Sequence, residues 1–366
     1  MHKNLNDNLK KFLVSEPCFN QTKEKNYIPY ITFNSVEDMK HFKSHHWGQR
    51  KLLLGELMFF TITASAGSQK SVRQTKVIYA GGAPCDHITI LNTLFPNLHF
   101  DLIDPAPWNE TFVAQYPSLG KENNTSNPEH FKINDKIDVY HGYFTDALAQ
   151  ELAEKYKNEQ VLFISDIRDL YVDSKSDTIK QREDIVNSNM QDQSRWFSII
   201  QNLNAKPEDV WCMLKFKPTF GTQTIEYFDG MLFYQGWAPL KSPELRLITN
   251  TVKTKIYDTV WLEQHLSWYN DVRRNTLVEK SKDPRINALW DTQYEYDLLT
   301  AYKEKNKWCK MSQLDLMFYI SKNLGRFGGY NKQLRKYMFQ AGYNPEPWRM
   351  QKWCERVVTK NNKYGN

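Results

Sequence analysis

Short apolar runs alternate with helix-like segments along much of the chain, and this alternation restricts the possible folds. Predicted strands cover 75–82, 98–104, 136–142, 159–169 and 209–218. One helix is predicted to begin near residue 48, and three more are predicted over 84–95, 144–157 and 180–204. Because strands that alternate with helices pair in parallel, the pattern predicts an α/β fold of the Rossmann-like type, with a mostly parallel central sheet and helices on both faces.

The pattern loosens after about residue 220. Short strands are predicted within 230–237 and 244–250, followed by helices at 258–275, 293–304, 312–325 and 331–341. The polar segment 118–135 predicts a loop insertion, and 169–177 predicts a loop that follows a strand. We therefore expect an N-terminal arm (1–45), one main domain (46–330) with a helical C-terminal extension, and a tail (331–366).

The tail is basic and rich in aromatic residues. The whole chain carries a net charge of only +6, but lysine and arginine gather in 331–366 between tyrosine, phenylalanine and tryptophan. Cations that meet phosphates and rings that stack on bases favour single-stranded nucleic acid. A solvated helix that packs on the main domain explains the same composition, so both interpretations stay open.

Cysteine usage and hydropathy exclude several classes of protein. The five cysteines are scattered and form no CxxC pair, so we expect neither a zinc site nor a disulfide framework. The N-terminus lacks the apolar core of a signal peptide, and no run approaches the ~18 apolar residues that span a membrane. The sequence predicts a protein without a membrane segment, in a reducing compartment.

Glycines and an acid mark one edge of the predicted sheet. The first strand ends in Gly81-Gly82-Ala83-Pro84-Cys85, and the second ends in Asp104. Glycines permit a tight turn beside a ligand, and the acid can accept hydrogen bonds from both ribose hydroxyls of an adenosine. A dinucleotide is less favoured, because the later glycines of its fingerprint are missing. A simple turn with a surface acid remains the alternative.

Four charged residues form a candidate catalytic set: Lys51, Asp166, Lys215 and Glu244. Asp166 and Lys215 follow apolar strand cores, so both are expected at the ligand edge of the sheet. Lys51 begins a helix whose other face is apolar. Any one of these lysines, taken alone, fits an exposed surface residue better.

The four residues suit methyl transfer to an alcohol. This reaction requires alignment of the hydroxyl with the methyl group and removal of the hydroxyl proton. A lysine removes a proton only when it is neutral, and burial or a nearby cation lowers its pKa. We therefore assign Lys215 as the base and Lys51 as the cation that assists it, with Asp166 and Glu244 as orienting and charge-balancing groups.

At these residues the chain resembles the poxvirus cap-specific mRNA 2′-O-methyltransferases, whose members also serve as the small (regulatory) subunit of poly(A) polymerase. The motifs are GQRKLLLGEL, VIYAGGAP, LFISDIR and PELRLI, and the similarity runs from about Tyr27 to about 300. The order Lys-Asp-Lys-Glu matches the catalytic tetrad of the family. The resemblance implies a class I methyltransferase fold, S-adenosyl-L-methionine as methyl donor, and capped mRNA and a poly(A) polymerase catalytic subunit as partners.

The resemblance also implies two binding sites. The donor site would comprise Gln49, Tyr79, Gly81, Ala83, Pro84, His87, Asp104, Phe144, Asp166 and Arg168. The cap pocket would stack the methylated guanine between Tyr27 and Phe220, with Glu263 on its edge, because a cationic purine stacks well on aromatic rings. Three further cations are expected at the cap or the RNA: Arg50, Lys217 and Arg246.

The chain departs from the family at three positions near the two expected binding sites. Cys85 replaces a glycine, Thr222 replaces a second acid that reads the methylguanine, and Ala106 replaces an arginine near the ribose. Because Thr222 stands where the family has an acid, it affects how strictly a methylated cap is expected to be selected.

Several functions follow, in order of preference. The first is methylation of the 2′-hydroxyl of the first transcribed nucleotide in capped mRNA. The second is a non-catalytic RNA-binding subunit of a poly(A) polymerase, which the first does not exclude. The third is 2′-O-methylation of another RNA, and a dehydrogenase comes last. A large DNA virus is the expected source, and host cytoplasm or virion the expected location.

Overall fold

The computed structural model describes residues 5–14, 47–64, 75–167, 179–239, 242–271, 273–275 and 289–324. Its centre is an eight-stranded sheet in the order β3-β4-β2-β1-β5-β6-β9-β8. The strands are β1 (Thr75–Ala80), β2 (Leu98–Asp104), β3 (Glu129–Asn134), β4 (Ile137–His141), β5 (Gln160–Ser165), β6 (Val210–Phe216), β8 (Met231–Phe233) and β9 (Leu245–Thr249). A separate two-stranded sheet pairs β7 (Thr224–Phe228) with β10 (Thr254–Asp258).

The five central strands β4, β2, β1, β5 and β6 run parallel, and β3, β9 and β8 add antiparallel pairs at the two sides. The apolar runs explain this arrangement, because a strand covered by helices on both faces must be apolar on both faces. Val77, Ile78 and Tyr79 of β1 are all buried, as are Leu162 and Phe163 of β5. The predicted fold class is confirmed.

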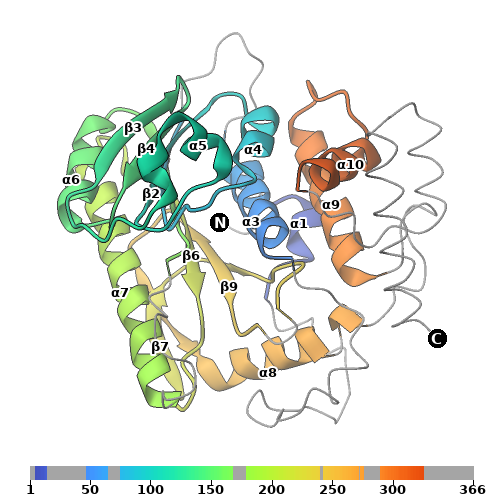
Figure 1. The fold of residues 1–366 in the computed structure, drawn as a ribbon. Coiled ribbons are helices and arrows are strands. Elements are labelled where there is room, and N and C mark those ends of the chain that lie inside the picture. Colours follow the sequence, from blue (N-terminus) through green and yellow to red (C-terminus); the bar gives the residue numbers. More distant parts are fainter. Residues whose placement is uncertain are drawn as a thin grey trace.

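Helices cover both faces of the sheet. They are α1 (Asp7–Lys10), α3 (Gly48–Thr63), α4 (Ile88–Leu94), α5 (Glu110–Gln115), α6 (Asp146–Lys155), α7 (Ile179–Leu203), α8 (Thr259–Asp271), α9 (Trp290–Lys305) and α10 (Gln313–Asn323). In Figure 1, α6 and α7 lie on one side of the sheet, and α3, α9 and α10 lie on the other. Helix α9 packs on α3, and α10 packs on α9, so the C-terminal helices form an outer layer, in line with the predicted helical extension.

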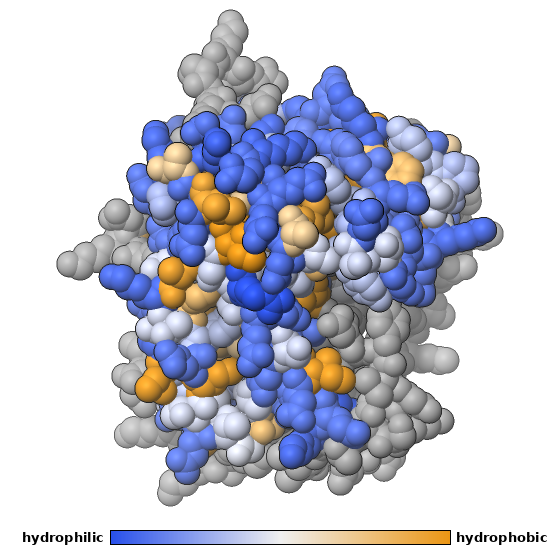
Figure 2. Space-filling model, turned by 90° about the vertical axis from the view of Figure 1, so that its left-hand side faces the viewer, coloured by the Kyte–Doolittle hydropathy of each residue, from blue (hydrophilic) through white to orange (hydrophobic). Residues whose placement is uncertain are grey.

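The face that carries α6 and α7 is mostly hydrophilic, with hydrophobic residues gathered in small separate patches (Figure 2). Across the described part of the chain, no helix combines the length and the apolar character needed to cross a membrane.

Two local predictions were wrong. The segment 118–135, predicted as a loop, contains the edge strand β3, most of whose side chains are exposed and which therefore lacks an apolar pattern. The strand predicted over 159–169 ends at Ser165, so Asp166 begins the following loop. The predicted loop at 169–177 and the tail at 331–366 lie outside the described residues.

The described part of the N-terminal arm packs against the main domain. Leu9 and Phe12 are buried, Leu13 bridges to Phe233, and the Val14 amide donates to the Leu232 carbonyl at 2.9 Å. Residues 5–14 therefore extend the core at the β8 side of the sheet.

A buried ion pair fixes the outer helix layer to α3. Arg50 of α3 is 2% exposed, and its Nε and Nη2 donate to the Glu295 carboxylate of α9 at 2.8 and 2.5 Å. The Trp237 indole donates to the same carboxylate at 3.0 Å. Arg50 is therefore enclosed by protein and its charge is paired with Glu295, so the structure assigns it a structural contact, and its expected contact with cap or RNA stays a prediction.

We expect Glu295→Ala to lower the free energy of unfolding by about 3–5 kcal/mol, because it leaves the Arg50 guanidinium buried without its counter-charge. Urea unfolding measures this loss. Glu304→Ala removes an exposed carboxylate from the same helix and should change the stability by less than about 0.5 kcal/mol. Equal effects of the two substitutions would contradict the assignment.

Candidate active site

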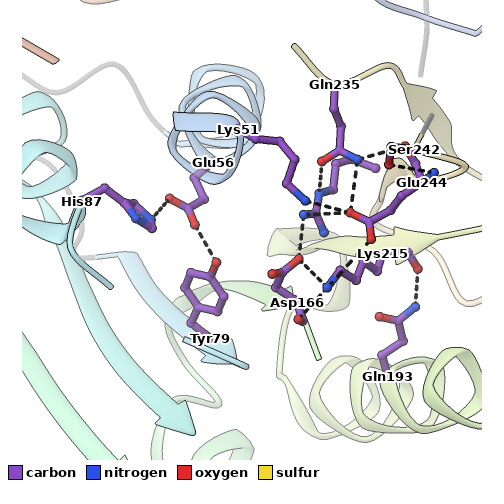
Figure 3. Close-up of polar contacts among 11 residues, drawn as sticks. Lys51, Glu56, Tyr79, His87, Asp166, Gln193, Lys215, Gln235, Ser242 and Glu244 are labelled. Carbon is purple, nitrogen blue, oxygen red and sulfur yellow. Dashed lines mark hydrogen bonds and ion pairs between the residues drawn. The ribbon is translucent and has the colours of Figure 1, made fainter. Parts of the chain in front are cut away.

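The four charged residues singled out in the sequence meet at the carboxyl ends of the central strands (Figure 3). Lys215 Nζ lies 3.1 Å from Asp166 Oδ1 and 3.9 Å from Glu244 Oε2. Lys51 Nζ, from the first turn of α3, lies 3.1 Å from Glu244 Oε1. The Asp166 carbonyl also accepts a hydrogen bond from Lys215 Nζ at 2.9 Å. We call this group, together with Arg246, the charge cluster.

Arg246 is the fifth member of the charge cluster. Its Nη2 lies 2.6 Å from Asp166 Oδ1 and 3.4 Å from Glu244 Oε1, and its Nε donates to Gln235 at 3.0 Å. Residues 215 and 246 face each other in the antiparallel pair of β6 and β9. Arg246 is only 2% exposed, and its guanidinium orients the two carboxylates; its expected contact with cap or RNA stays a prediction.

The charge cluster shifts the pKa of both members of its central pair. Burial lowers the pKa of Lys215, and the cations Arg246 and Lys51 lower it further, against the opposing effect of Asp166 and Glu244. Burial opposes ionisation of Asp166, but Lys215, Arg246 and Lys51 outweigh it and lower the pKa of this acid. The cluster therefore keeps Asp166 ionised and brings Lys215 closer to its neutral form.

The glycine turn after β1 packs against the loop that carries Asp166. Gly81 has a φ of 83°, and a Cβ at this position would lie 2.8 Å from the Ile167 amide nitrogen. A side chain here would be strained and would displace the neighbouring loop. Gly81 thus brings the ends of β1 and β5 together, a role in packing that the sequence did not predict.

Asp104, at the end of β2, lies beside the same turn. Its Oδ2 accepts from the Ala83 amide at 3.1 Å, and its Oδ1 accepts from the Ala106 amide at 2.8 Å. Burial raises the pKa of Asp104, and these two backbone amides oppose that shift. The carboxylate is held in place and remains partly exposed, so each oxygen retains a lone pair for a further donor.

Three of the expected donor-site residues are linked through Glu56. The Tyr79 hydroxyl donates to Glu56 Oε1 at 2.6 Å, and His87 Nε2 lies 2.6 Å from Glu56 Oε2 (Figure 3). His87 Nδ1 lies 2.8 Å from Gln49 Oε1. Phe144 contributes differently, because it is buried and packs edge-on against Trp196. Arg168 lies outside the described residues.

A second group surrounds Phe220, the described half of the expected cap sandwich. Lys217 Nζ lies 4.4 Å from the centre of the Phe220 ring and forms an ion pair with Glu183 of α7. The Phe220 amide donates to the other Glu183 oxygen at 3.1 Å. Lys217 is buried, so it does not present its charge to RNA as expected. Tyr27 lies outside the described residues.

Glu263 and Thr222 border this group. Burial raises the pKa of Glu263, whereas Lys217 opposes the shift. Thr222 is exposed, and its hydroxyl donates to the Thr219 carbonyl at 2.9 Å. A pocket of about 330 Å³ opens on the side of Thr222, between α7 and β7.

One group of possible metal ligands occurs among the described residues, at the opposite ends of the strands. His99, Asp101 and Asp138 bring ligand atoms within 4.8 Å of one another. Burial raises the pKa of Asp101 to about 6, against the opposing effect of Lys155 and Lys76. This group lies apart from the charge cluster.

Sequence reasoning missed Glu56, Glu183 and Gln235 and the burial of Arg246. Glu56 alone gave a signal, since it is a carboxylate on the apolar side of a predicted helix. Glu183, Gln235 and Arg246 gave no such signal, because each contacts residues of elements that are distant in the sequence.

The sheet order and the charge cluster define an α/β protein with a polar site at its strand ends. The family described as poly A polymerase regulatory subunit matches residues 22–324, and the chain belongs to this family. None of the curated proteins matches the chain significantly.

Solved structures give weak similarities. Bluetongue virus VP4, described as a multifunctional RNA-capping production-line, is 12% identical with a TM-score of 0.37, over 66% of this chain and 33% of that one. The chain thus spans about a third of the VP4 structure. An antibiotic-related methyltransferase is 11% identical with a TM-score of 0.23, over 60% of this chain and 98% of that one.

We expect Arg246→Gln to raise the pKa of Lys215, because it removes a neighbouring cation and leaves both carboxylates in place. Isotope-edited NMR of reductively methylated lysines, titrated with pH, measures this shift. Arg195→Gln, which removes an arginine paired with Asp146 at the protein surface, should leave the pKa unchanged. A lower pKa of Lys215 in the Arg246 variant would refute the arrangement.

Proposed function

We propose that the protein is an S-adenosyl-L-methionine-dependent methyltransferase that modifies the ribose 2′-hydroxyl of the first transcribed nucleotide of capped mRNA. One observation carries this proposal: a buried lysine of lowered pKa, Lys215, lies among oriented charges at the strand ends, beside the turn and acid that suit an adenosine. Membership of the poly A polymerase regulatory subunit family supports a role that involves RNA ends.

The residues at the donor edge fit the proposed cofactor. Asp104 is fixed by two backbone amides and retains acceptor capacity for ribose hydroxyls. Tyr79, His87 and Gln49 line up through Glu56, and the Gly81 turn closes the edge towards Asp166. These residues would hold the donor, together with Ala83 and Pro84. When bound, the donor supplies a methyl group on a sulfonium, whose sulfur is a good leaving group.

The charge cluster provides the remaining chemistry. Neutral Lys215 would accept the proton of the ribose hydroxyl at Nζ, while the donor would give up its methyl group by cleavage of the bond to sulfur and leave as a neutral thioether. Asp166 holds Lys215 through its carboxylate and its carbonyl, and Glu244 holds Lys51. These contacts fix the direction of the base before the reaction, so little reorganisation is required in the transition state.

Cap recognition would involve Phe220 and Glu263. The Phe220 backbone is held by Glu183, which fixes a ring that can stack on a cationic purine. Glu263 would accept hydrogen bonds from the guanine edge, and Tyr27 would cover the second face. Thr222 supplies a hydroxyl where the resemblance expects an acid, so the charge contribution to selecting a methylated cap is smaller in this chain.

We expect Lys215→Met to reduce methyl transfer to capped RNA by about 10²–10⁴-fold, the usual contribution of a general base. Donor binding should be retained, because the donor-edge residues are unchanged. The wild-type rate should rise with pH through the lowered pKa of Lys215 and then level off, since only the neutral amine accepts a proton. Lys255→Met, which removes an exposed lysine paired with Asp229, is the matched control.

The cap-specific part of the proposal is tested with three RNAs: one with a methylguanosine cap, one with an unmethylated cap and one without a cap. Product digestion followed by mass spectrometry locates the methyl group. Transfer should be fastest to the methylguanosine-capped RNA and should occur on the 2′-oxygen of the first nucleotide. Equal transfer to all three RNAs would reject cap specificity, and a methyl group on a base would reject the reaction.

The family supports a second function, the regulation of a poly(A) polymerase catalytic subunit. If this role uses other surfaces, Lys215→Met should stimulate poly(A) extension as well as the wild type does while it lacks methyl transfer. Tail length on an oligonucleotide primer, with and without the protein, measures this. Parallel loss of both activities would show that the two roles share the charge cluster.

A further inference from the structure

Glu56 is a fully buried carboxylate in the middle of α3, with an exposed fraction of 0%. A buried charge is retained at a considerable cost in desolvation unless good partners surround it. Glu56 Oε1 accepts from the Tyr79 hydroxyl at 2.6 Å, whereas its Oε2 lies 2.6 Å from His87 Nε2 without the geometry of a hydrogen bond. An apolar side chain would fill the same space, so the charge itself needs an explanation.

The partners of Glu56 flank the glycine turn. Tyr79 lies at the end of β1, and His87 lies just before α4, so the turn at 81–85 runs between them. Gln49 and Glu56 are seven residues apart on α3, about two helical turns, and therefore lie on one face. Both contact the His87 ring, Gln49 at Nδ1 and Glu56 at Nε2. Helix α3 thus fixes both ends of the turn.

The same helix also carries a member of the charge cluster. Lys51 contacts Glu244 from the first turn of α3, whereas Glu56 contacts Tyr79 and His87 from the next turns. Figure 3 shows Glu56 directed to the Tyr79 and His87 side and Lys51 to the Asp166 and Lys215 side. Burial and, after it, the Glu56 carboxylate raise the pKa of Tyr79, so Glu56 acts on this member of the donor edge electrostatically as well as by its hydrogen bond.

We propose that Glu56 is a positioning residue for the methyl donor, which holds Tyr79, His87 and Gln49 at the donor edge and makes this edge favour a cationic sulfonium over a neutral thioether. This inference rests on the proposed function. The donor carries a positive sulfur and the product does not, so a buried negative charge nearby stabilises the donor more than the product. Product would then leave more readily than donor.

The test is the Glu56→Gln variant, which keeps the size of the side chain and removes its charge. Isothermal titration calorimetry measures the binding of S-adenosyl-L-methionine and of S-adenosyl-L-homocysteine separately. We expect donor affinity to fall by about tenfold or more, as for loss of a hydrogen-bonded charge, and product affinity to fall distinctly less. In steady state the KM for the donor should rise more than kcat falls.

Asp291→Asn is the matched control. It also neutralises a buried, ion-paired carboxylate, here one bonded to Arg274 at 3.0 and 3.1 Å, and it should change the melting temperature without changing the ratio of the two affinities. If Glu56→Gln does not fold, Glu56→Asp, which keeps the charge on a shorter side chain, and Tyr79→Phe, which removes one partner, replace it. Glu56→Asp should keep the preference for the donor, and Tyr79→Phe should weaken donor binding.

The outcomes separate this inference from the proposed function. A wild-type protein that binds neither molecule refutes the proposed function and the inference with it. A wild-type protein that binds the donor, with an unchanged ratio of affinities in Glu56→Gln, refutes only the role of Glu56. Equal losses for donor and product would show that Glu56 is simply a structural brace.

Discussion

The charge balance of the buried cluster at the strand ends determines what the site can do. Lys51, Lys215 and Arg246 face only two carboxylates, Asp166 and Glu244, and all five side chains are at most 14% exposed. An excess positive charge is costly in a desolvated place, and arginine does not release its proton. The most buried lysine, Lys215, is therefore the group whose deprotonation restores neutrality. The capacity to accept a proton follows from the composition of the cluster and does not reside in one residue.

Helix α3 gives the cluster its frame. Its apolar residues from Leu53 to Phe60 are buried, and its polar residues Gln49, Arg50, Lys51 and Glu56 reach partners in the surrounding elements. A shift by one residue would rotate the helix by about 100° and leave these charges buried without partners. The polar contacts therefore set the rotation and register of the helix, while the apolar residues supply its burial.

Much of the fold was predictable because the signal is local. Apolar runs bounded by turns marked every central parallel strand, and β2 was predicted with its observed bounds. The edge strand β3 was missed because an exposed strand has no apolar period. The strand ends located Asp104, Asp166 and Lys215 at one edge of the sheet. The burial of Arg50 and Arg246 was not predicted, because whether an arginine faces solvent or a buried carboxylate depends on contacts such as Arg50–Glu295, which join distant parts of the chain.

The three cations that were expected at the cap or the RNA are buried in ion pairs within the protein. Arg50 is paired with Glu295, Lys217 with Glu183, and Arg246 with Asp166, so each charge is already compensated within the protein. Nucleic-acid affinity depends on cations that can neutralise phosphates and release counterions, and compensated buried groups contribute little to it. Outside these ion pairs, the tail 331–366 is one segment of the sequence in which lysine and arginine are interleaved with aromatic residues. An internally compensated charge cluster and a basic, aromatic-rich segment thus occupy separate parts of the sequence, and each can change without altering the charge balance of the other.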